Sequence, residues 1–163
     1  MKALNGIIDK AEFYSSPNCD SRPDNIDIDL FVIHAISLPP GDYNTQLIKD
    51  LFLNNLDPGS NEFLKSIENL KVSSHFLITR SGTLIQFVPI HKRSWHAGKS
   101  SFQGRTNCND FSIGIELEGC DNEEFTSKQY DALSELILFL SDSLKINKNN
   151  IVGHSEIAPE RKT

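Results

Sequence analysis

The strictest alternation of hydrophobic and polar residues in this chain runs through residues 109–119. Because successive side chains on a strand point to opposite faces, this pattern predicts a strand with one apolar and one polar face. The polar face combines small residues with two carboxylates, which fits either the floor of a cleft or an ordinary solvent-exposed face. The apolar face holds Ile113, Ile115 and Leu117, and the polar face holds Ser112, Gly114, Glu116 and Glu118.

Four further stretches have the pattern of strands. An apolar run of branched residues predicts a buried strand that carries one polar side chain, His34. Two runs that flank Arg80-Ser81-Gly82 predict a hairpin, because glycine supplies the backbone freedom that a tight turn needs. A short apolar pair predicts a last strand that leads to His154. The predicted strands cover residues 30–36, 72–79, 83–88 and 151–152.

Apolar residues at helical spacing predict four helices. Side chains that can cap the first turn mark where the second and the last helix begin. The helices are expected within residues 1–13, from Asn44 or Thr45 to Leu53, within residues 61–70, and from Thr126 or Ser127 onward. The last helix has the clearest inward stripe, formed by Tyr130, Leu133, Leu136, Ile137, Leu140 and Leu144. Helices that alternate with strands predict an α/β or α+β fold with a central mixed β-sheet flanked by helices.

Residues 89–109 show little apolar periodicity and contain the only tryptophan of the chain, Trp95. A loop of this length in a compact domain is usually either functional or flexible. Trp95 suits the apolar wall of a binding site and, equally, an anchor that packs the loop on the core.

The composition is that of one soluble globular domain covering residues 1–163, with 38% hydrophobic and 23% charged residues. The first 13 residues contain no long apolar run, so we expect neither a signal peptide nor a membrane span. Three cysteines without a C-x-x-C spacing indicate reduced thiols in a cytoplasmic protein, which we expect to be a monomer. These cysteines are Cys19, Cys108 and Cys120.

The net charge of −6 argues against nucleic-acid binding. Residues 69–109 nevertheless contain no acidic residue. This basic segment suits a small anionic ligand, but it also fits an ordinary set of solvated surface charges. Its cations are Lys71, Arg80, Lys92, Arg93, Lys99 and Arg105.

Two of the five histidines, His34 and His154, lie at the ends of predicted strands. Strand ends that are distant in sequence can meet in space, and neutral imidazoles are good zinc ligands. A histidine in an apolar strand is more often a hydrogen-bonded core residue, so spacing alone leaves both interpretations open. His75 and His91 are interpreted as structural, and His96 as a residue of the cleft.

The motifs at residues 34–41, 95–98, 109–119 and 153–163 agree in order and spacing with one known family. Together with Ser16-Pro17-Asn18 and Arg22-Pro23, they resemble the AmpD family of zinc-dependent cytoplasmic N-acetylmuramoyl-L-alanine amidases. The resemblance extends over almost the whole chain. It implies the fold of the wider amidase and peptidoglycan-recognition group, a central mixed sheet flanked by helices.

The resemblance also implies an activity and the residues that perform it. Members hydrolyse the amide between the lactyl group of (1,6-anhydro-)N-acetylmuramic acid and L-alanine of the stem peptide, in cell-wall recycling. His34 and His154 correspond to zinc ligands, and zinc lowers the pKa of bound water to roughly 7. Glu116 corresponds to the residue that orients or deprotonates this water, with Glu118 as a rival. Lys162 corresponds to the cation that stabilises the developing oxyanion.

One departure concerns the third zinc ligand of the family, an aspartate that follows the Lys-Thr pair matched by Lys162 and Thr163. That aspartate is absent from the sequence, although catalytic zinc sites usually have three protein ligands. We expect the sequence to be truncated and a longer chain to bind zinc more tightly. Glu156 and Glu160 are less suitable substitutes. The alternative is a muropeptide-binding module without turnover.

A second departure concerns the stem peptide, because Lys71 and Asn107 stand where the family commonly has arginines. Lysine keeps the positive charge but lacks the two-pronged geometry of a guanidinium, and asparagine is uncharged. Lys99 and Arg105 are candidates to compensate. The predicted substrate-binding residues are Trp95, His96, Arg105 and Lys71.

Overall fold

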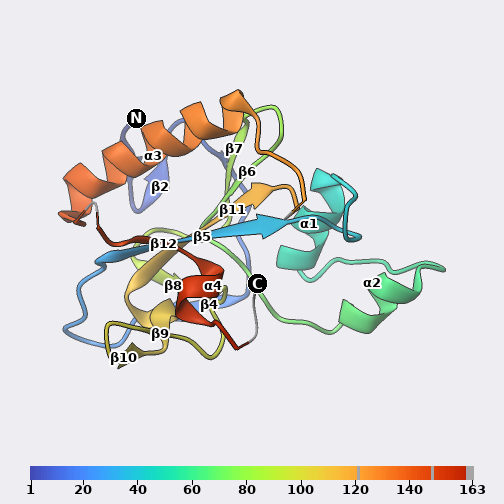
Figure 1. Ribbon diagram of the computed structural model, residues 1–163, viewed down its shortest axis with the longest axis horizontal. Coiled ribbons are helices and arrows are strands. Elements are labelled where there is room, and N and C mark those ends of the chain that lie inside the picture. Colours follow the sequence, from blue (N-terminus) through green and yellow to red (C-terminus); the bar gives the residue numbers. More distant parts are fainter. Residues whose placement is uncertain (121, 148, 161–163) are drawn as a thin grey trace.

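The fold is built on a six-stranded mixed sheet surrounded by helices and short strands (Figure 1). The computed structural model describes residues 1–120, 122–147 and 149–160. Neighbouring strands of this sheet run parallel, except for the antiparallel β6–β7 hairpin, so the predicted mixed sheet is confirmed. The order is β12 (Ile151–Gly153), β5 (Leu30–Ile36), β11 (Ser112–Glu118), β6 (Phe76–Ile78), β7 (Leu84–Gln86) and β3 (Glu12–Phe13).

β11 lies inside the sheet, between β5 and β6, and is covered on both faces. Ile113 packs into the core cluster that includes Leu136 of α3 (Ser127–Leu144). The opposite face is buried as well, since Ser112 has no exposed surface and a Cβ on Gly114 would lie 2.5 Å from the His96 ring. The alternative of a solvent-exposed polar face is therefore wrong.

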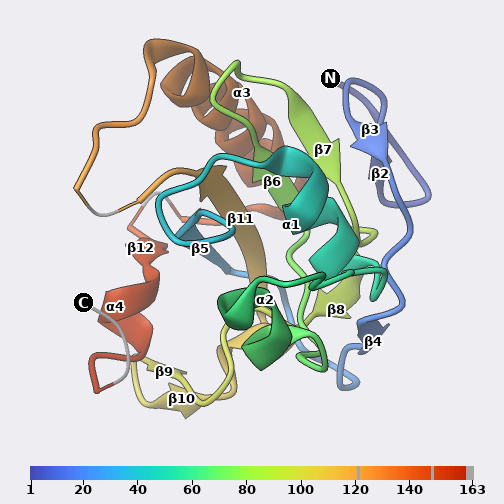
Figure 2. The ribbon, with the colours of Figure 1, turned by 90° about the vertical axis from the view of Figure 1, so that its right-hand side faces the viewer.

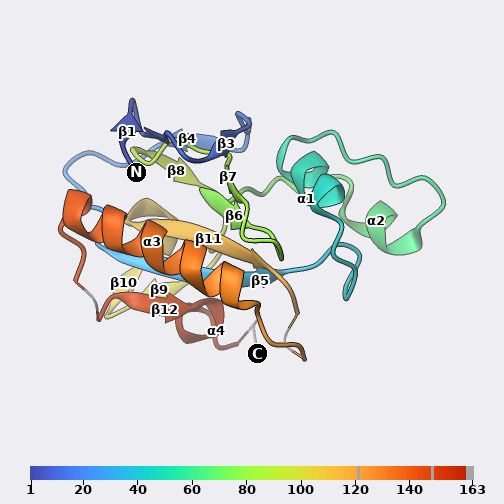
Figure 3. The same ribbon diagram turned by 90° about the horizontal axis from the view of Figure 1, so that it is seen from above.

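α3 runs along one face of the sheet (Figure 3). It begins with a capping box, in which Thr126 Oγ1 accepts from the Gln129 backbone and the Gln129 side chain accepts from the Thr126 backbone. Leu136 and Leu140 are fully buried, as predicted, but Tyr130 is 53% exposed, so its expected inward position is wrong. Among the helices described, none is long and apolar enough to cross a membrane.

α1 (Thr45–Phe52) and α2 (Glu62–Ile67) lie beyond the end of β5, and α1 packs over the other face of β6 and β7 (Figure 2). Asn44 and Asn61 cap them by accepting from the backbone nitrogens of Leu47 and Leu64. Both helices were expected from the sequence. The short α4 (His154–Ile157) follows β12 directly.

Residues 1–13 form a hairpin and an edge strand, so the helix predicted for them is wrong. Asn5 and Gly6 join β1 (Ala3–Leu4) to β2 (Ile7–Ile8) with φ angles of 51° and 77°. Two residues with positive φ give the turn that fits the twist of a hairpin, and Asn-Gly favours it. The Gln86 side chain fixes this hairpin through the Ile8 nitrogen and the Gly6 carbonyl, both at 2.8 Å.

Residues 89–109 contain short strands in place of an irregular loop. The partly buried guanidinium of Arg22 donates to the carbonyls of Asn109, Asp110 and Ser112 at 2.9–3.0 Å, which ties the end of this segment to β11. The elements are β8 (Lys92–Ser94), which pairs with β4 (Cys19–Ser21), the hairpin of β9 (Ser101–Phe102) and β10 (Arg105–Thr106), and the following 3-10 turn η1 (Cys108–Asp110).

All three cysteines are free thiols, as predicted. Cys108 is buried in the cluster that also contains Ala97 and Phe111. Cys19 and Cys120 are partly exposed.

Candidate active site

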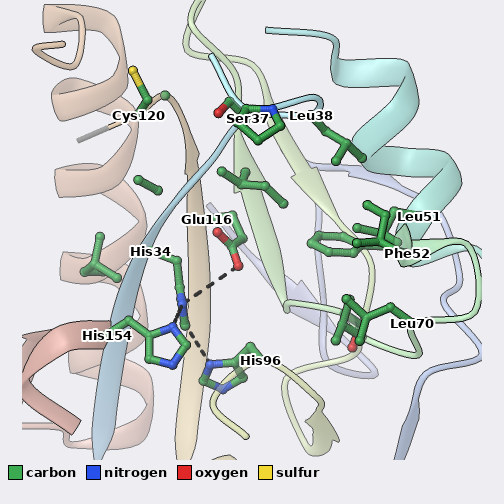
Figure 4. A pocket seen from close by; sticks show the side chains of 18 of the residues that line it. His34, Ser37, Leu38, Leu51, Phe52, Leu70, His96, Glu116, Cys120 and His154 are labelled. Atoms are coloured by element: carbon green, nitrogen blue, oxygen red, sulfur yellow. Dashed lines mark hydrogen bonds and ion pairs between the residues drawn. The ribbon is translucent and has the colours of Figure 1, made fainter. Parts of the chain in front are cut away.

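Three side chains meet where parallel strands β12, β5 and β11 end. The pairing of β5 with β11 places His34 directly opposite Glu116, and β12 brings His154 in beside β5. His34 Nδ1 lies 2.8 Å from His154 Nδ1 and 3.9 Å from Glu116 Oε1 (Figure 4). His34 and Glu116 are only 6% and 8% exposed. The backbone of the sheet therefore fixes the convergence that the sequence predicted for these residues.

His96 lies beside His34 as well and contacts its other ring nitrogen (Figure 4). His96 Nδ1 lies 2.9 Å from His34 Nε2, and the side-chain oxygen of Asn109 holds the His96 and Ala97 backbone nitrogens at 3.1 and 2.8 Å. Desolvation above all, and then the neighbouring His75 and His154 rings, hold the pKa of His96 well below its ordinary value of 6.5. A neutral His96 ring is therefore part of the site.

A cleft of about 920 Å³ extends from these histidines to α1 and α2. Its volume is at the upper end of the range usual for small-molecule sites. One end is polar and contains the side chains just described. The other end is apolar and is lined by Leu51, Phe52, Phe63, Ile67, Leu70 and Trp95.

Trp95 combines the two roles that the sequence left open. Its ring lines the cleft, while its Nε1 donates to Asp20 Oδ1 at 3.2 Å and so anchors the segment. Arg93 and, to a lesser degree, Trp95 lower the pKa of the Asp20 carboxyl against the opposing effect of desolvation.

Glu118 shares a strand face with Glu116 but has other partners. Its Oε1 accepts from Thr45 Oγ1 at 2.6 Å, and its Oε2 accepts from the Arg80 backbone nitrogen at 3.0 Å. Only 3% of Glu118 is exposed, and it does not line the cleft. The carboxylate thus joins α1 and the β6–β7 hairpin to the end of β11.

The basic segment is largely neutralised by ion pairs. Arg93 bonds to Asp20 and Asp110 at 2.6 Å, and two other arginines, Arg80 and Arg105, pair with Glu123 and Asp29 at 3.0 Å. The interpretation as a set of surface charges therefore describes these three arginines better than an anion site does.

The four substrate residues expected from the sequence are not gathered in one place. Trp95 and His96 line the cleft. Lys71 is exposed and lies between the lining residues Leu70 and Val72, whereas Arg105 is paired elsewhere and is not part of the lining. Lys162, the expected oxyanion partner, lies outside the described residues.

Imidazole nitrogens are a donor type that suits zinc, and His34 and His154 present two of them side by side. Within residues 1–120, 122–147 and 149–160, no three histidine, cysteine, aspartate or glutamate side chains form a metal-binding group. Glu156 is engaged in capping, because its Oε2 accepts from the Gly153 backbone nitrogen at 2.6 Å, and Glu160 is exposed. Neither glutamate therefore joins His34 and His154 in the described part of the chain.

Sequence reasoning missed the residues that support His96, namely Asn109, Ser112 and Gly114. One signal was available, because a glycine inside a strand of branched residues often marks a close approach by another group. At Gly114 that group is the His96 ring.

Comparisons with known proteins show the family to which the chain belongs. The family model described as N-acetylmuramoyl-L-alanine amidase matches residues 24–163. The chain is 47% identical to the 1,6-anhydro-N-acetylmuramyl-L-alanine amidase AmpD of Citrobacter freundii over 158 residues, which cover 97% of the chain and 84% of that protein.

Solved structures of amidases are similar to this chain as well. A crystal structure of a Se-Met AmpD derivative is similar with a TM-score of 0.96 and 46% identity, covering 100% of this chain and 91% of that one. The complex of Escherichia coli AmiD with anhydro-N-acetylmuramic acid-L-Ala-D-γ-Glu-L-Lys is similar with a TM-score of 0.59 and 28% identity, covering 86% and 54%.

Proposed function

Because the chain belongs to the N-acetylmuramoyl-L-alanine amidase family, we propose that it is a 1,6-anhydro-N-acetylmuramyl-L-alanine amidase. It hydrolyses the amide between the lactyl group of (1,6-anhydro-)N-acetylmuramic acid and L-alanine of the stem peptide, in muropeptide recycling. The observation that supports this most is the meeting of His34, His154 and Glu116 at one end of a large cleft.

In this proposal His34 and His154 hold a zinc ion. When bound, zinc polarises the amide carbonyl and brings the pKa of water to about 7. The protein supplies two imidazole nitrogens that already face each other, 2.8 Å apart. Their rings are held by a sheet and a short helix, so little reorganisation is needed to present both nitrogens to a metal.

Glu116 moves the proton in this reaction. An amide nitrogen is a poor leaving group unless it is protonated as the bond breaks, so a group must take a proton from the attacking water and deliver it to that nitrogen. Glu116 Oε1 faces the two histidines and lines the cleft. Lys162 is proposed to meet the negative oxygen of the tetrahedral intermediate.

Trp95 and His96 are proposed to contact the substrate, since both line the cleft. His96 lies at the polar end beside His34, and Trp95 provides an apolar wall for the sugar or for L-alanine. Lys71 is proposed to reach the acidic stem peptide from the edge of the cleft. Arg105 would have to exchange its partner Asp29 to do the same. We further propose that the protein acts as a monomer in the cytoplasm on soluble muropeptides.

The test is incubation with an anhydro-muramyl tripeptide, with and without zinc, followed by chromatography of the free peptide. We expect zinc-dependent release that a chelator abolishes. Binding without release would support a muropeptide-binding module. Absence of both binding and release from zinc-loaded protein would refute the proposal.

A further inference from the structure

A chain of hydrogen-bonded groups leads from His154 through two more rings to a backbone carbonyl. His154 Nδ1 faces His34 Nδ1 at 2.8 Å, and His34 Nε2 faces His96 Nδ1 at 2.9 Å. His96 Nε2 lies 3.1 Å from Ser112 Oγ, which lies 2.5 Å from the carbonyl oxygen of Cys108. In a neutral imidazole ring one nitrogen is a donor and the other an acceptor. The direction of the hydrogen bond between Ser112 and the Cys108 carbonyl therefore determines which atom carries the hydrogen in each of the other bonds.

The carbonyl of Cys108 can only accept a hydrogen bond. The hydroxyl hydrogen of Ser112 must therefore point to it, because two bare oxygens 2.5 Å apart would repel each other. Ser112 Oγ is then the acceptor for His96 Nε2, and this nitrogen carries a hydrogen.

The hydrogen on Nε2 leaves Nδ1 of the neutral His96 ring as an acceptor. His34 Nε2 then donates to His96 Nδ1, so that in a neutral His34 ring Nδ1 carries no hydrogen and accepts from His154 Nδ1. This tautomer is assigned from the hydrogen bonds.

We infer that Ser112 and His96 are positioning residues that set the tautomer of His34 and so direct its Nδ1 toward the metal. The inference rests on the proposed function only for the identity of the metal. Hydrogen bonds to the second nitrogen of a ligating histidine commonly fix its orientation and strengthen it as a ligand.

Two further contacts hold His96 in place. The Asn109 side chain bonds to its backbone nitrogen at 3.1 Å, and the absence of a side chain at Gly114 makes room for its ring. A Cβ at position 114 would lie 2.5–2.7 Å from three ring atoms. Gly114→Ala should therefore push the ring away from His34.

The inference is tested in metal-free protein at pH 8, where histidines of ordinary pKa are neutral. Two-dimensional ¹H–¹⁵N correlation of the imidazole rings reports which nitrogen of each carries the hydrogen. We expect the Nε2–H form for both His34 and His96. In Ser112→Ala and Gly114→Ala, His34 should become a mixture of both forms, and zinc affinity measured by chelator competition should fall about tenfold or more.

Two variants serve as matched controls. Ser94→Ala removes another buried serine that bonds to a histidine, His75, at 2.7 Å. Gly119→Ala introduces a Cβ 2.5 Å from the Phe125 ring. Neither should change the His34 tautomer or the zinc affinity.

An Nδ1–H form of His34 in the wild-type spectrum would overturn the inference. Unchanged tautomer or unchanged zinc affinity in both Ser112→Ala and Gly114→Ala would overturn it as well. If these variants do not fold, the wild-type spectrum alone decides. Because the spectrum needs neither zinc nor substrate, its outcome is separate from peptide release, which tests the proposed function.

Discussion

Two carboxylates stand two residues apart on one face of β11, and their surroundings give them different tasks. Glu116 Oε1 lies 3.9 Å from His34 Nδ1, and Glu116 borders the cleft. Glu118 is held by Thr45 and Arg80. A proton acceptor must reach the reacting atoms, and a carboxylate fully engaged in structural hydrogen bonds cannot.

Glu116→Gln should lower peptide release by roughly 10²-fold or more, because the amide cannot take the proton. Zinc affinity and the free energy of unfolding should change little. Glu118→Gln is the matched control, and it should cost about 1–3 kcal/mol of stability while the activity of the folded protein persists. Steady-state kinetics and urea unfolding check both variants, and equal losses of activity in the two would contradict these assignments.

At the residue scale, the sequence alone could not separate these two glutamates. Their difference depends on α1 and the β6–β7 hairpin, which are distant in sequence. The same holds for Ser112 and Gly114, whose partner His96 reaches them only because Asn109 and Arg22 fold residues 89–109 back onto β11. The pair His34 and His154 was predictable through the family resemblance, and spacing alone left it open.

At the scale of elements, segments with local signals were predictable. Asn44 and Thr126 cap helices, as expected for one of two candidates in each case, since a cap is a contact over three residues. Asn61 caps α2 in the same way, although no cap was predicted there. The N-terminal hairpin was missed because its apolar residues also fit helical spacing. The Asn5-Gly6 pair was the competing local signal, and the tertiary contact with Gln86 supports it.

Thr126→Ala should destabilise the protein by about 1–2 kcal/mol, because the hydroxyl caps α3 at Gln129 and also donates to the Arg80 carbonyl at 2.9 Å. Urea unfolding measures the loss. Ser127→Ala, at the exposed neighbouring position, should stay within about 0.5 kcal/mol of the wild type. A loss at Ser127 as large as that at Thr126 would argue against the capping role.

Gly6→Ala should cost more stability than Gly104→Ala, although both glycines lie in hairpin turns with φ near 80°. Both changes force alanine into a left-handed conformation, at about 1–2 kcal/mol. A Cβ at position 6 would also lie 2.6 Å from His91 Nδ1 and 3.1 Å from the Ile90 nitrogen, whereas position 104 is open. Equal losses in urea unfolding would show that this crowding is relieved at no cost.

At the scale of the molecule, the Arg22 guanidinium and the neutral His75 ring lie where separate segments of the chain meet. Arg22 joins the segment after β4 to η1 and β11. His75 is fully buried among β6, β8 and β11, where it accepts from the Gly114 nitrogen at 3.1 Å and bonds to Ser94. Desolvation first, and then the Arg22 charge, lower the pKa of His75 to about 3.

This pKa predicts how stability depends on pH. In the unfolded chain His75 binds a proton near pH 6.5, whereas in the folded protein it stays neutral down to about pH 3. The neutral His75 therefore makes its full contribution to the free energy of unfolding above pH 6.5, and this contribution is lost as the pH falls toward 3. Between pH 6 and 5 the loss should approach about 1.4 kcal/mol per pH unit. Urea unfolding of wild type and His75→Gln tests this, since the variant should show a shallower slope. Identical slopes would contradict it.

The pairing of His34 with Glu116 across β5 and β11 affects how the sequences of related proteins can change. The separation of the two side chains is set by the spacing of adjacent strands, which is about 4.8 Å in any sheet. The walls of the cleft come from other parts of the chain, chiefly α1, α2 and the segment around Trp95. The walls can thus be rebuilt for other substrates while the spacing of His34 and Glu116 stays unchanged.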